Sequence, residues 1–495
     1  MDFIGIIGIF TLLGLTWLMS YDKKNIPFKI IFWGIGLQFL FALIILRVDY
    51  ISFLGMGLLA VLILFYQYSK YLENKKIELS HIITPILLIS GIIYCIYYDY
   101  TGGYILDAFS KKVAYFLSLS DYGAQFLFGN LANQDFFGPW EGKFPNIGTW
   151  PGFGFQFAFK VLPTIIFFGA VMSVLYYLGI IQKIINSLSK FMRWTIGTSG
   201  AETLSCSANI FVGQTEAPLL IKPFINKMTK SELTTIMVGG FATIAGGILA
   251  GIMQLGIDPG HLIAASVMSA PAALVIGKII FPEKEKSETS GESELPDIHV
   301  GSNVVEAASN GITDGLKLAV NVGAMLVGFI AIIALVDVIL NWLDSLIDGS
   351  LLNGEYIEYA SSSLSPLQGE YAGYFPGSLK TLFGTLLKPL AFIMGAPWNE
   401  ADKLGNLLGV KLSMNEYIAY LQLSGEELSP KTKIIATYAL CGFANFSSIG
   451  IQIGGISALA PKRKSDLARI GLKAMFGGAI ASWITATIAG LLMAF

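Results

Sequence analysis

The chain has 495 residues, of which 54% are hydrophobic and only 13% are charged. Soluble domains carry about 25% charged residues, so this composition and a mean hydropathy of +0.65 exclude an ordinary soluble protein. The net charge of −2 gives no basis for a nucleic-acid partner. The three cysteines and three histidines are too scattered for a zinc or haem enzyme.

Apolar runs long enough to cross a bilayer recur along the chain, and we expect about ten spans. The runs lie at 3–20, 27–47, 51–71, 80–98, 158–181, 233–256, 260–281, 314–343, 432–460 and 468–494. Residues 3–19 are interpreted as a first span rather than a signal peptide, because no small-residue cleavage site follows them. Basic residues at 23–24, 75–76, 183–193 and 462–464 all fall on the cytoplasmic side if the N-terminus is outside.

The connections between these runs differ in character. Residues 104–130 are expected to form an amphipathic helix on the outer surface, followed by an external loop at 131–157. Residues 283–300 are charged and rich in serine, which is typical of a flexible linker. Residues 344–380 are polar with few basic residues, which favours the outside.

Two further apolar segments, 198–227 and 385–426, are broken by Gly, Pro, Asn and Glu. Irregular backbone at membrane depth is tolerated only where it is buried in protein or lines a wet cavity. We therefore predict that both segments are re-entrant helical hairpins. The expected fold is an all-α polytopic membrane protein with two such hairpins.

Each hairpin carries a carboxylate, Glu216 in the first and Glu416 in the second. Each is followed about 25 residues later by Gly-Phe-Ala in an apolar helix that small residues interrupt, at Gly240–Ala242 and Gly442–Ala444. The order of hairpin, broken helix and helix thus occurs twice, with the span at 314–343 between the copies. Inverted repeats with interrupted helices are typical of transporters that bind substrate at the repeat interface.

The side chains near these breaks indicate what such a site could bind. Gln, Thr, Glu, Asn and Ser offer donors and acceptors together, which suits a neutral polar solute, and carbonyl oxygens at a helix break suit sodium. Phe443 could form an apolar wall against a ring. An intramembrane enzyme would need a nucleophile–base pair or a metal site, which the sequence does not offer, and a passive channel stays open as a third possibility.

Several motifs resemble those of the concentrative nucleoside transporter family. The first hairpin carries Gly213–Leu220 (GQTEAPLL), and the second carries Gly409–Tyr420 (GVKLSMNEYIAY), with Tyr and Ile where the family commonly has Phe and Val. Phe443–Ser448 (FANFSS) resembles the family's unwound helix, and Val161–Phe168 (VLPTIIFF) its third scaffold span. The match covers roughly 155–495. The segment 48–100 and the long loop before the second hairpin depart from shorter bacterial members.

The resemblance implies roles for individual residues. The nucleobase is expected to contact Gln214, Thr215 and Glu216, and the ribose hydroxyls Glu416, Asn445 and Ser448, with Phe443 lining the pocket. A sodium ion is expected between the first hairpin tip and the broken helix. Its expected ligands are Asn209, Thr243 and the backbone carbonyls of Val212 and Ile244.

The resemblance also implies a sodium-coupled nucleoside importer of a bacterial inner membrane, a homotrimer in which a transport domain moves against a scaffold. Proton coupling through Glu216 or Glu416 is the alternative. The expected organisation follows the chain: N-terminal spans (1–100), an external helix and loop (101–157), a scaffold helix with a cytoplasmic interfacial helix (158–197), transport repeat 1 (198–282), a linker with a scaffold helix and external loop (283–384), and transport repeat 2 (385–495).

Purely structural interpretations of these residues stay open at this point. Glu216 could cap a helix or pair with Lys222, and Glu416 could lie on a shallow hairpin at the membrane surface. Asn209 could serve only as a helix cap, and Thr243 could bond back to its own helix. Asn445 and Ser448 could only satisfy the broken backbone, Phe443 could only pack, and Lys411 could be an interfacial residue without a role.

Overall fold

The chain folds into α-helices with a single described β-hairpin. The computed structural model describes residues 4–74, 79–133, 136, 156–289, 301–358 and 366–493. The N-terminal helices are α1 (Ile4–Leu18), α2 (Phe28–Leu46), α3 (Tyr50–Asn74), α4 (Ser80–Tyr97), α5 (Gly102–Ser118) and α6 (Ser120–Phe128), followed by the short turn η1 (Gly129–Leu131). The single amphipathic helix predicted over 104–130 is therefore wrong in detail, because the chain forms two helices that meet at Leu119.

The middle of the chain contains the first hairpin and the first broken helix. Its helices are α7 (Phe157–Tyr177), α8 (Ile180–Ile196), α9 (Gly200–Ala208), η3 (Ala217–Ile221), α10 (Lys222–Ile225), α11 (Lys230–Ala242), α12 (Gly246–Met253) and α13 (Pro259–Ile280). Capping explains several of these boundaries. Thr229 and Glu232 form a reciprocal capping box at the start of α11, and Asp258 accepts from His261 N ahead of Pro259 in α13.

The C-terminal part begins with the longest helix, α14 (Val304–Asp344), which starts ten residues before the predicted run at 314–343. The following elements are the π-helical turn η4 (Ser345–Leu351), β1 (Tyr356–Glu358), β2 (Gly369–Tyr371), α15 (Leu379–Ile393), α16 (Ala401–Ser413), α17 (Glu416–Gly425), α18 (Pro430–Leu440), α19 (Phe446–Leu459), η5 (Pro461–Arg463) and α20 (Lys464–Leu492). The two strands are antiparallel, with Tyr356 opposite Tyr371. The described part of the polar segment 344–380 thus contains a π-helical turn and two strands rather than a plain loop.

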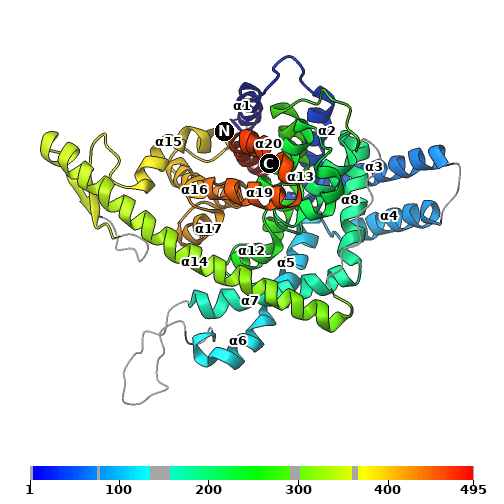
Figure 1. The fold of residues 1–495 in the computed structure, drawn as a ribbon, viewed down its shortest axis with the longest axis horizontal. Helices are drawn as coiled ribbons and strands as arrows, with labels where there is room; N and C mark the ends of the chain where they lie inside the picture. Colours follow the sequence, from blue (N-terminus) through cyan, green and yellow to red (C-terminus); the bar gives the residue numbers. More distant parts are fainter. Residues whose placement is uncertain are drawn as a thin grey trace.

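A buried core and outlying helices can be distinguished by how much of each span other helices cover. The apolar windows of α13, of α20 and of the α11–α12 pair are each 89% buried, whereas those of α3, α7 and α14 are 17%, 22% and 24% buried. Helices α11, α13, α18 and α20 pack on one another, and α1 and α2 pack against this group. In Figure 1, α14 crosses the molecule beside α7, and α3 and α4 project from the opposite side.

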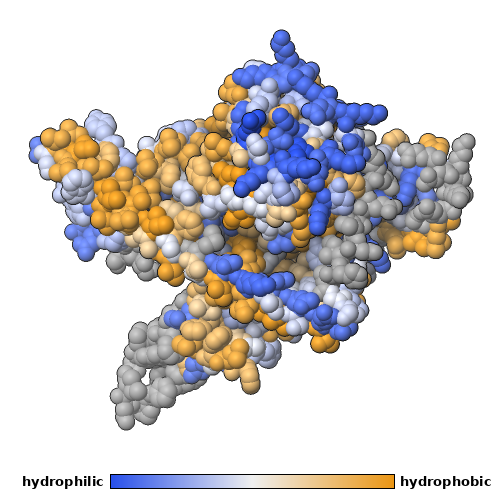
Figure 2. All heavy atoms as spheres, in the orientation of Figure 1, coloured by the Kyte–Doolittle hydropathy of each residue, from blue (hydrophilic) through white to orange (hydrophobic). Residues whose placement is uncertain are grey.

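Hydropathy on the visible face agrees with a membrane-embedded chain. Figure 2 shows apolar side chains over both outlying parts and hydrophilic side chains gathered around the α1–α2 connection. Three contacts join loops at that end: Tyr21 N donates to Ile280 O at 2.8 Å, Lys284 pairs with Asp22 at 2.6 Å, and Arg463 donates to Met228 O at 2.6 Å. Tyr21 Oη also donates to Arg469 O at 3.4 Å, so the predicted basic segment at 23–24 lies near the start of α20, which follows the segment at 462–464. The N-terminus outside stays a prediction.

The number of spans differs from the ten predicted runs. Among the described residues, seven helices are long and apolar enough to cross a membrane, and eight if the pair bent by 94° after α4 counts as one span. The remaining two runs contain shorter helices. The run at 3–20 is the 15-residue α1, and the run at 432–460 is divided between α18 and α19.

Two predicted boundaries are corrected by the structure. Hairpin 2 is formed by α16 and α17, so it begins near Ala401; residues 385–393 belong to α15, which packs along α16. Residues 283–289 are not a free linker, because Gly200 N donates to Thr289 O at 2.8 Å and Thr289 Oγ1 donates to Glu232 at 2.6 Å. The rest of that linker and most of the predicted loop at 131–157 lie outside the described residues.

Candidate functional site

The first hairpin brings its tip against the break in the first interrupted helix. Every residue of α9 is buried, and a capping box between Ser199 and Glu202 fixes where the helix begins. After Asn209 the chain turns and returns through η3. A Cβ on Gly213 would lie 3.2 Å from Cβ of Ala245, which belongs to the break between α11 and α12. The tip therefore approaches the broken helix closely, at a position where the chain has no side chain.

The two helix breaks touch each other, although about 200 residues separate them. Phe443 N donates to Thr243 O at 3.3 Å. Gly442 has φ +123°, a conformation that favours glycine, and a Cβ there would lie 2.6 Å from Phe241 O. Ser482 of α20 donates to Cys441 O at 2.5 Å. The interruptions predicted in both apolar helices are therefore present, and they form one joined structure at the centre of the core.

The second hairpin presents Glu416 at its turn. Asn415 caps α17 by accepting from Ile418 N at 2.9 Å, so Glu416 is the first residue of that helix. Glu416 is only 4% exposed, and its Oε2 accepts from Asn445 Nδ2 at 3.2 Å. This burial argues against the interpretation of Glu416 as a membrane-surface residue.

A chain of amides and hydroxyls joins the second break to the first hairpin. Asn445 caps α19 by accepting from Ser448 N at 2.8 Å. Gln214 Nε2 donates to Ser448 Oγ at 3.3 Å, and Gln214 Oε1 accepts from Gln452 Nε2 at 3.0 Å. Asn445 thus does satisfy the broken backbone, but its amide nitrogen also reaches Glu416. The network leaves each side chain held in one orientation.

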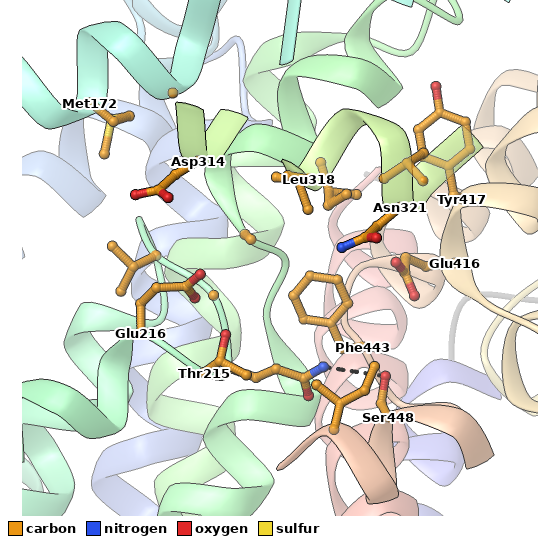
Figure 3. Close-up of a pocket in the computed structure, with 18 of the residues that line it drawn as sticks. Met172, Thr215, Glu216, Asp314, Leu318, Asn321, Glu416, Tyr417, Phe443 and Ser448 are labelled. Atoms are coloured by element: carbon orange, nitrogen blue, oxygen red, sulfur yellow. Dashed lines mark hydrogen bonds between the residues drawn. The ribbon is translucent and has the colours of Figure 1, made fainter. Parts of the chain in front are cut away.

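A cavity of about 740 Å³ opens beside this network. All seven residues predicted to contact substrate line it: Gln214, Thr215, Glu216, Glu416, Phe443, Asn445 and Ser448. Figure 3 shows Glu216 and Glu416 on opposite sides of the cavity, with Phe443 between them and the Gln214–Ser448 hydrogen bond below. The structure therefore brings together residues from both repeats.

The two glutamates differ in environment. Glu416 is buried, whereas Glu216 is exposed on the cavity wall. No ion pair joins Glu216 to Lys222 in the part of the chain that the structure describes, and Lys222 is exposed. The two glutamates, which occupy matching positions in the two hairpins, therefore line the same cavity but differ in how deeply they are buried. Glu216 is free to meet a solute from the solvent side, and Glu416 is held deep in the protein.

Of the four predicted sodium ligands, Asn209 and Val212 lie in the turn of the first hairpin, and Thr243 and Ile244 lie in the break between α11 and α12. Asn209 is 1% exposed, and its Oδ1 is buried without a hydrogen-bond partner among the described residues. A Cβ on Gly239 would lie 3.6 Å from Asn209 Nδ2, which puts Asn209 beside the last turn of α11 before Thr243. Ile244 is fully buried, and Val212 lines the cavity.

These residues fit a sodium ion chemically. An unpartnered amide oxygen is a hard, neutral ligand, and such a buried acceptor is costly unless something binds it. Thr243 Oγ1 donates to Gly239 O at 2.9 Å, as the structural interpretation of this residue expected, yet its oxygen lone pairs remain able to accept. Asn209 does not act as a helix cap through Oδ1, because that atom accepts no hydrogen bond.

Sequence reasoning missed three features of the site. Gln452, which orients Gln214, lies beyond the motif at Phe443–Ser448. Lys411 was expected at the interface, but it is fully buried and donates to Ala439 O at 2.9 Å and Cys441 O at 3.3 Å, the carbonyls that end α18. One face of α14 also lines the cavity, through residues that include Asp314, Leu318 and Asn321 (Figure 3). Polar residues spaced seven apart in an apolar span were the available signal.

Three family models match this chain in order. "Na+ dependent nucleoside transporter N-terminus" matches residues 7–53, "Nucleoside recognition" matches 158–258, and "Na+ dependent nucleoside transporter C-terminus" matches 261–490. Together they cover more than half of the chain, and the last two include both hairpins and both broken helices.

Relatives agree with these models. A protein of Haemophilus influenzae named "Uncharacterized transporter" is 40% identical over 427 residues, covering 85% of this chain and 93% of the relative. Sodium/nucleoside cotransporter 2 of Mus musculus is 34% identical over 504 residues, covering 98% of this chain. The chain spans 62% of the length of that mouse protein, which is less than two thirds.

Solved structures of CNTnw share the fold. The structure of CNTnw in an inward-facing substrate-bound state has a TM-score of 0.74 at 32% identity, covering 99% of this chain and 98% of the other. A CNTnw variant in an outward-facing state has a TM-score of 0.77, covering 100% and 98%. The motif resemblance is thereby confirmed, and the family consists of transporters rather than enzymes. The chain belongs to the Na+ dependent nucleoside transporter family, whose coupling ion is sodium.

Proposed function

We propose that this chain imports nucleosides together with sodium across a bacterial inner membrane, with its N-terminus outside. The observation that carries the proposal is the cavity of about 740 Å³ that residues of both hairpins, of the second helix break and of α14 line together. A nucleoside has a flat base and a sugar with hydroxyl groups. The mixture of amides, hydroxyls, carboxylates and three aromatic rings (Tyr176, Tyr417 and Phe443) in this cavity matches that chemistry.

The proposed contacts divide the cavity into two ends. Gln214, Thr215 and Glu216 meet the nucleobase, directly or through water, and this arrangement is supported by the hydrogen bond from Gln452 that orients the Gln214 amide. At the other end, Glu416, Asn445 and Ser448 hold the ribose hydroxyls. A buried carboxylate that accepts from the Asn445 amide keeps further acceptor capacity for hydroxyl groups.

The proposed sodium ligands are Asn209, Thr243 and the carbonyls of Val212 and Ile244. This assignment is supported by Oδ1 of Asn209, which has no hydrogen-bond partner among the described residues. Asn209 is only 1% exposed and lies beside α11. One positive charge crossing about 100 mV gains about 2.3 kcal/mol. At about 1.4 kcal/mol per tenfold, one sodium could therefore sustain roughly a fiftyfold nucleoside gradient before its own concentration difference is added.

Transport is proposed to follow movement of a transport domain, formed by the two repeats at 198–282 and 385–495, against scaffold helices that include α7 and α14. The low burial of the α7 and α14 spans supports a scaffold role, because their exposed apolar faces need lipid or further subunits as neighbours. A homotrimer built through the scaffold is part of this proposal.

Uptake of radiolabelled uridine into proteoliposomes tests the proposal. An inward sodium gradient should drive accumulation above equilibrium, and replacement of sodium by choline should abolish it. A pH gradient imposed without sodium distinguishes the proton-coupled alternative, which the family descriptions do not name. Accumulation that is indifferent to sodium refutes sodium coupling, and equilibration without accumulation indicates a passive channel.

A further inference from the structure

Lys411 places a positive charge in the interior of the second repeat. It lies on α16, the first helix of hairpin 2, and is 0% exposed. Lysine is almost never fully buried unless its charge is paired. Its Nζ donates to Ala439 O at 2.9 Å and to Cys441 O at 3.3 Å, two carbonyls at the end of α18. The ammonium group therefore lies where the second helix break begins.

The carbonyls at this break need a donor, because α18 ends inside the protein. The last carbonyls of a helix have no partner within it and carry the negative end of its dipole. A hydroxyl group meets part of this need, since Ser482 Oγ donates to Cys441 O at 2.5 Å. A second neutral donor could meet the rest without the cost of burying an ammonium group. Capping of the helix therefore does not by itself explain why the buried donor is charged.

Glu416 supplies a reason for the charge. It begins α17, the second helix of hairpin 2, and is 4% exposed where it lines the nucleoside cavity (Figure 3). The charges of Lys411 and Glu416 are near enough to interact, while the hydrogen bonds of the ammonium group go to the backbone of α18 and of the break. Lys411 thus compensates the carboxylate and leaves its oxygens to Asn445 and to a solute.

The first repeat has a matching arrangement with a different cation. Thr243 and Cys441 are the residues that follow the first half of each broken helix, α11 and α18. The proposed sodium ion lies between Thr243 and Asn209, the residue that follows α9 of hairpin 1. Lys411 reaches from α16 of hairpin 2 to Cys441. A positive charge thus joins each break to the first helix of its hairpin, as an exchangeable ion in the first repeat and as a side chain in the second.

We propose that Lys411 is a positioning residue for the nucleoside site, a built-in cation that keeps Glu416 charged as the acceptor of the ribose hydroxyls. The inference rests on the proposed contact between Glu416 and the ribose. A buried carboxylate without a compensating charge is strongly unfavourable and becomes neutral by taking up a proton. A hydrogen bond to a charged acceptor raises affinity about 10- to 150-fold, against about 2- to 10-fold for a bond between neutral groups.

Calorimetric binding of uridine and of its 2′- and 3′-deoxy analogues to the full-length protein, in detergent and saturating sodium, tests this proposal. The wild type should prefer uridine to at least one analogue by about tenfold or more, and Lys411→Met should reduce that preference below about tenfold. Ser482→Ala removes a neutral donor to the same carbonyl of Cys441 and should keep the preference of the wild type. Lys433→Met, which removes an exposed lysine from α18, is the control and should bind as the wild type does.

A double variant shows whether Lys411 acts through Glu416. In the Glu416→Gln background, Lys411→Met should change the affinity for uridine by less than about twofold, whereas a purely structural role predicts the same loss in both backgrounds and overturns the proposal. If Lys411→Met alone does not fold, folding of the double variant supports the proposal, because neither charge is then left uncompensated. Failure to fold in both backgrounds overturns it.

The same measurements separate this inference from the function on which it rests. A wild type that binds uridine with a preference for the ribose, together with a Lys411→Met variant that keeps this preference, overturns the role of Lys411 alone. A wild type that binds no nucleoside overturns the proposed function.

Discussion

Replacing Glu416 by glutamine tests the proposed ribose contact in the cavity. The substitution keeps the shape of the side chain and keeps an acceptor for Asn445 Nδ2, which lies 3.2 Å from the carboxylate. It removes the negative charge from a group that is 4% exposed. The network that joins Asn445 to Gln214 should therefore survive, and the lost function should be confined to the acceptor offered to the ribose.

The expected loss follows from the strength of hydrogen bonds to charged groups. Such bonds contribute about 1.5–3 kcal/mol, and each 1.4 kcal/mol corresponds to a factor of ten in affinity. Calorimetric titration of the variant with nucleoside in saturating sodium should therefore give a dissociation constant about 10- to 150-fold higher. Glu427→Gln, which removes an exposed carboxylate between α17 and α18, is the control and should bind as the wild type does.

Deoxynucleosides provide a thermodynamic cycle for the same contact. If Glu416 accepts from the sugar, the wild type should lose affinity for 2′- or 3′-deoxynucleosides, and the Glu416→Gln variant should discriminate less between these and the parent nucleoside. A loss of equal size for nucleoside and deoxynucleosides, or no loss at all, would refute the assignment of Glu416 to the ribose.

Three further predictions concern residues around this site and at the loops beyond it. Asn209→Ala should raise the sodium concentration for half-maximal nucleoside binding by roughly tenfold, the effect of losing about 1.4 kcal/mol, while the order of preference among nucleosides stays the same. Gln452→Leu leaves Gln214 Oε1 without its donor, so the free energy of unfolding should fall by about 1–3 kcal/mol, and affinity for the free nucleobase should fall with it. The hydrogen bond from Lys284 lowers the pKa of Asp22 from 3.8 to about 2, so its stabilising contribution is present above pH 4 and is lost as the pH falls toward 2; Asp22→Asn should flatten the loss of melting temperature in that range.

The sequence made the hairpins and the helix breaks predictable, because Gly, Asn and Glu inside apolar segments are costly at membrane depth unless backbone and side chains serve a site. Those same residues identified the cavity lining, since each motif contributes a polar side chain at a position where the helix cannot continue. The N-terminal boundary of hairpin 2 was harder to predict from the sequence. Helix α15 is apolar enough to merge with hairpin 2 in the sequence, although a turn with Gly395 at φ +104° and Pro397 separates it from α16.

Features that depend on contacts between distant segments could not be predicted in this way. Lys411 lies in an apolar stretch next to the hairpin turn, where an interfacial position was reasonable, yet it reaches the carbonyls of Ala439 and Cys441 across the core. Gln452 is a single polar residue on a helix in the sequence, and its role appears only from its hydrogen bond to Gln214 in the fold. The burial of Asp344 and Asp348 likewise follows from a loop that returns nearly 30 residues later in the chain.

The contact between the two breaks gives a physical route by which sodium and nucleoside influence each other. Gly213 at the hairpin tip packs on Ala245, Thr243 O accepts from Phe443 N, and Phe443 lines the cavity. An ion that ordered Asn209 and Thr243 would therefore fix the backbone against which the nucleoside is bound. Coupling of this kind is reciprocal, so the factor by which sodium raises nucleoside affinity must equal the factor by which nucleoside raises sodium affinity. Gly442→Ala strains the junction at φ +123° without altering any proposed ligand, so it should reduce both factors together.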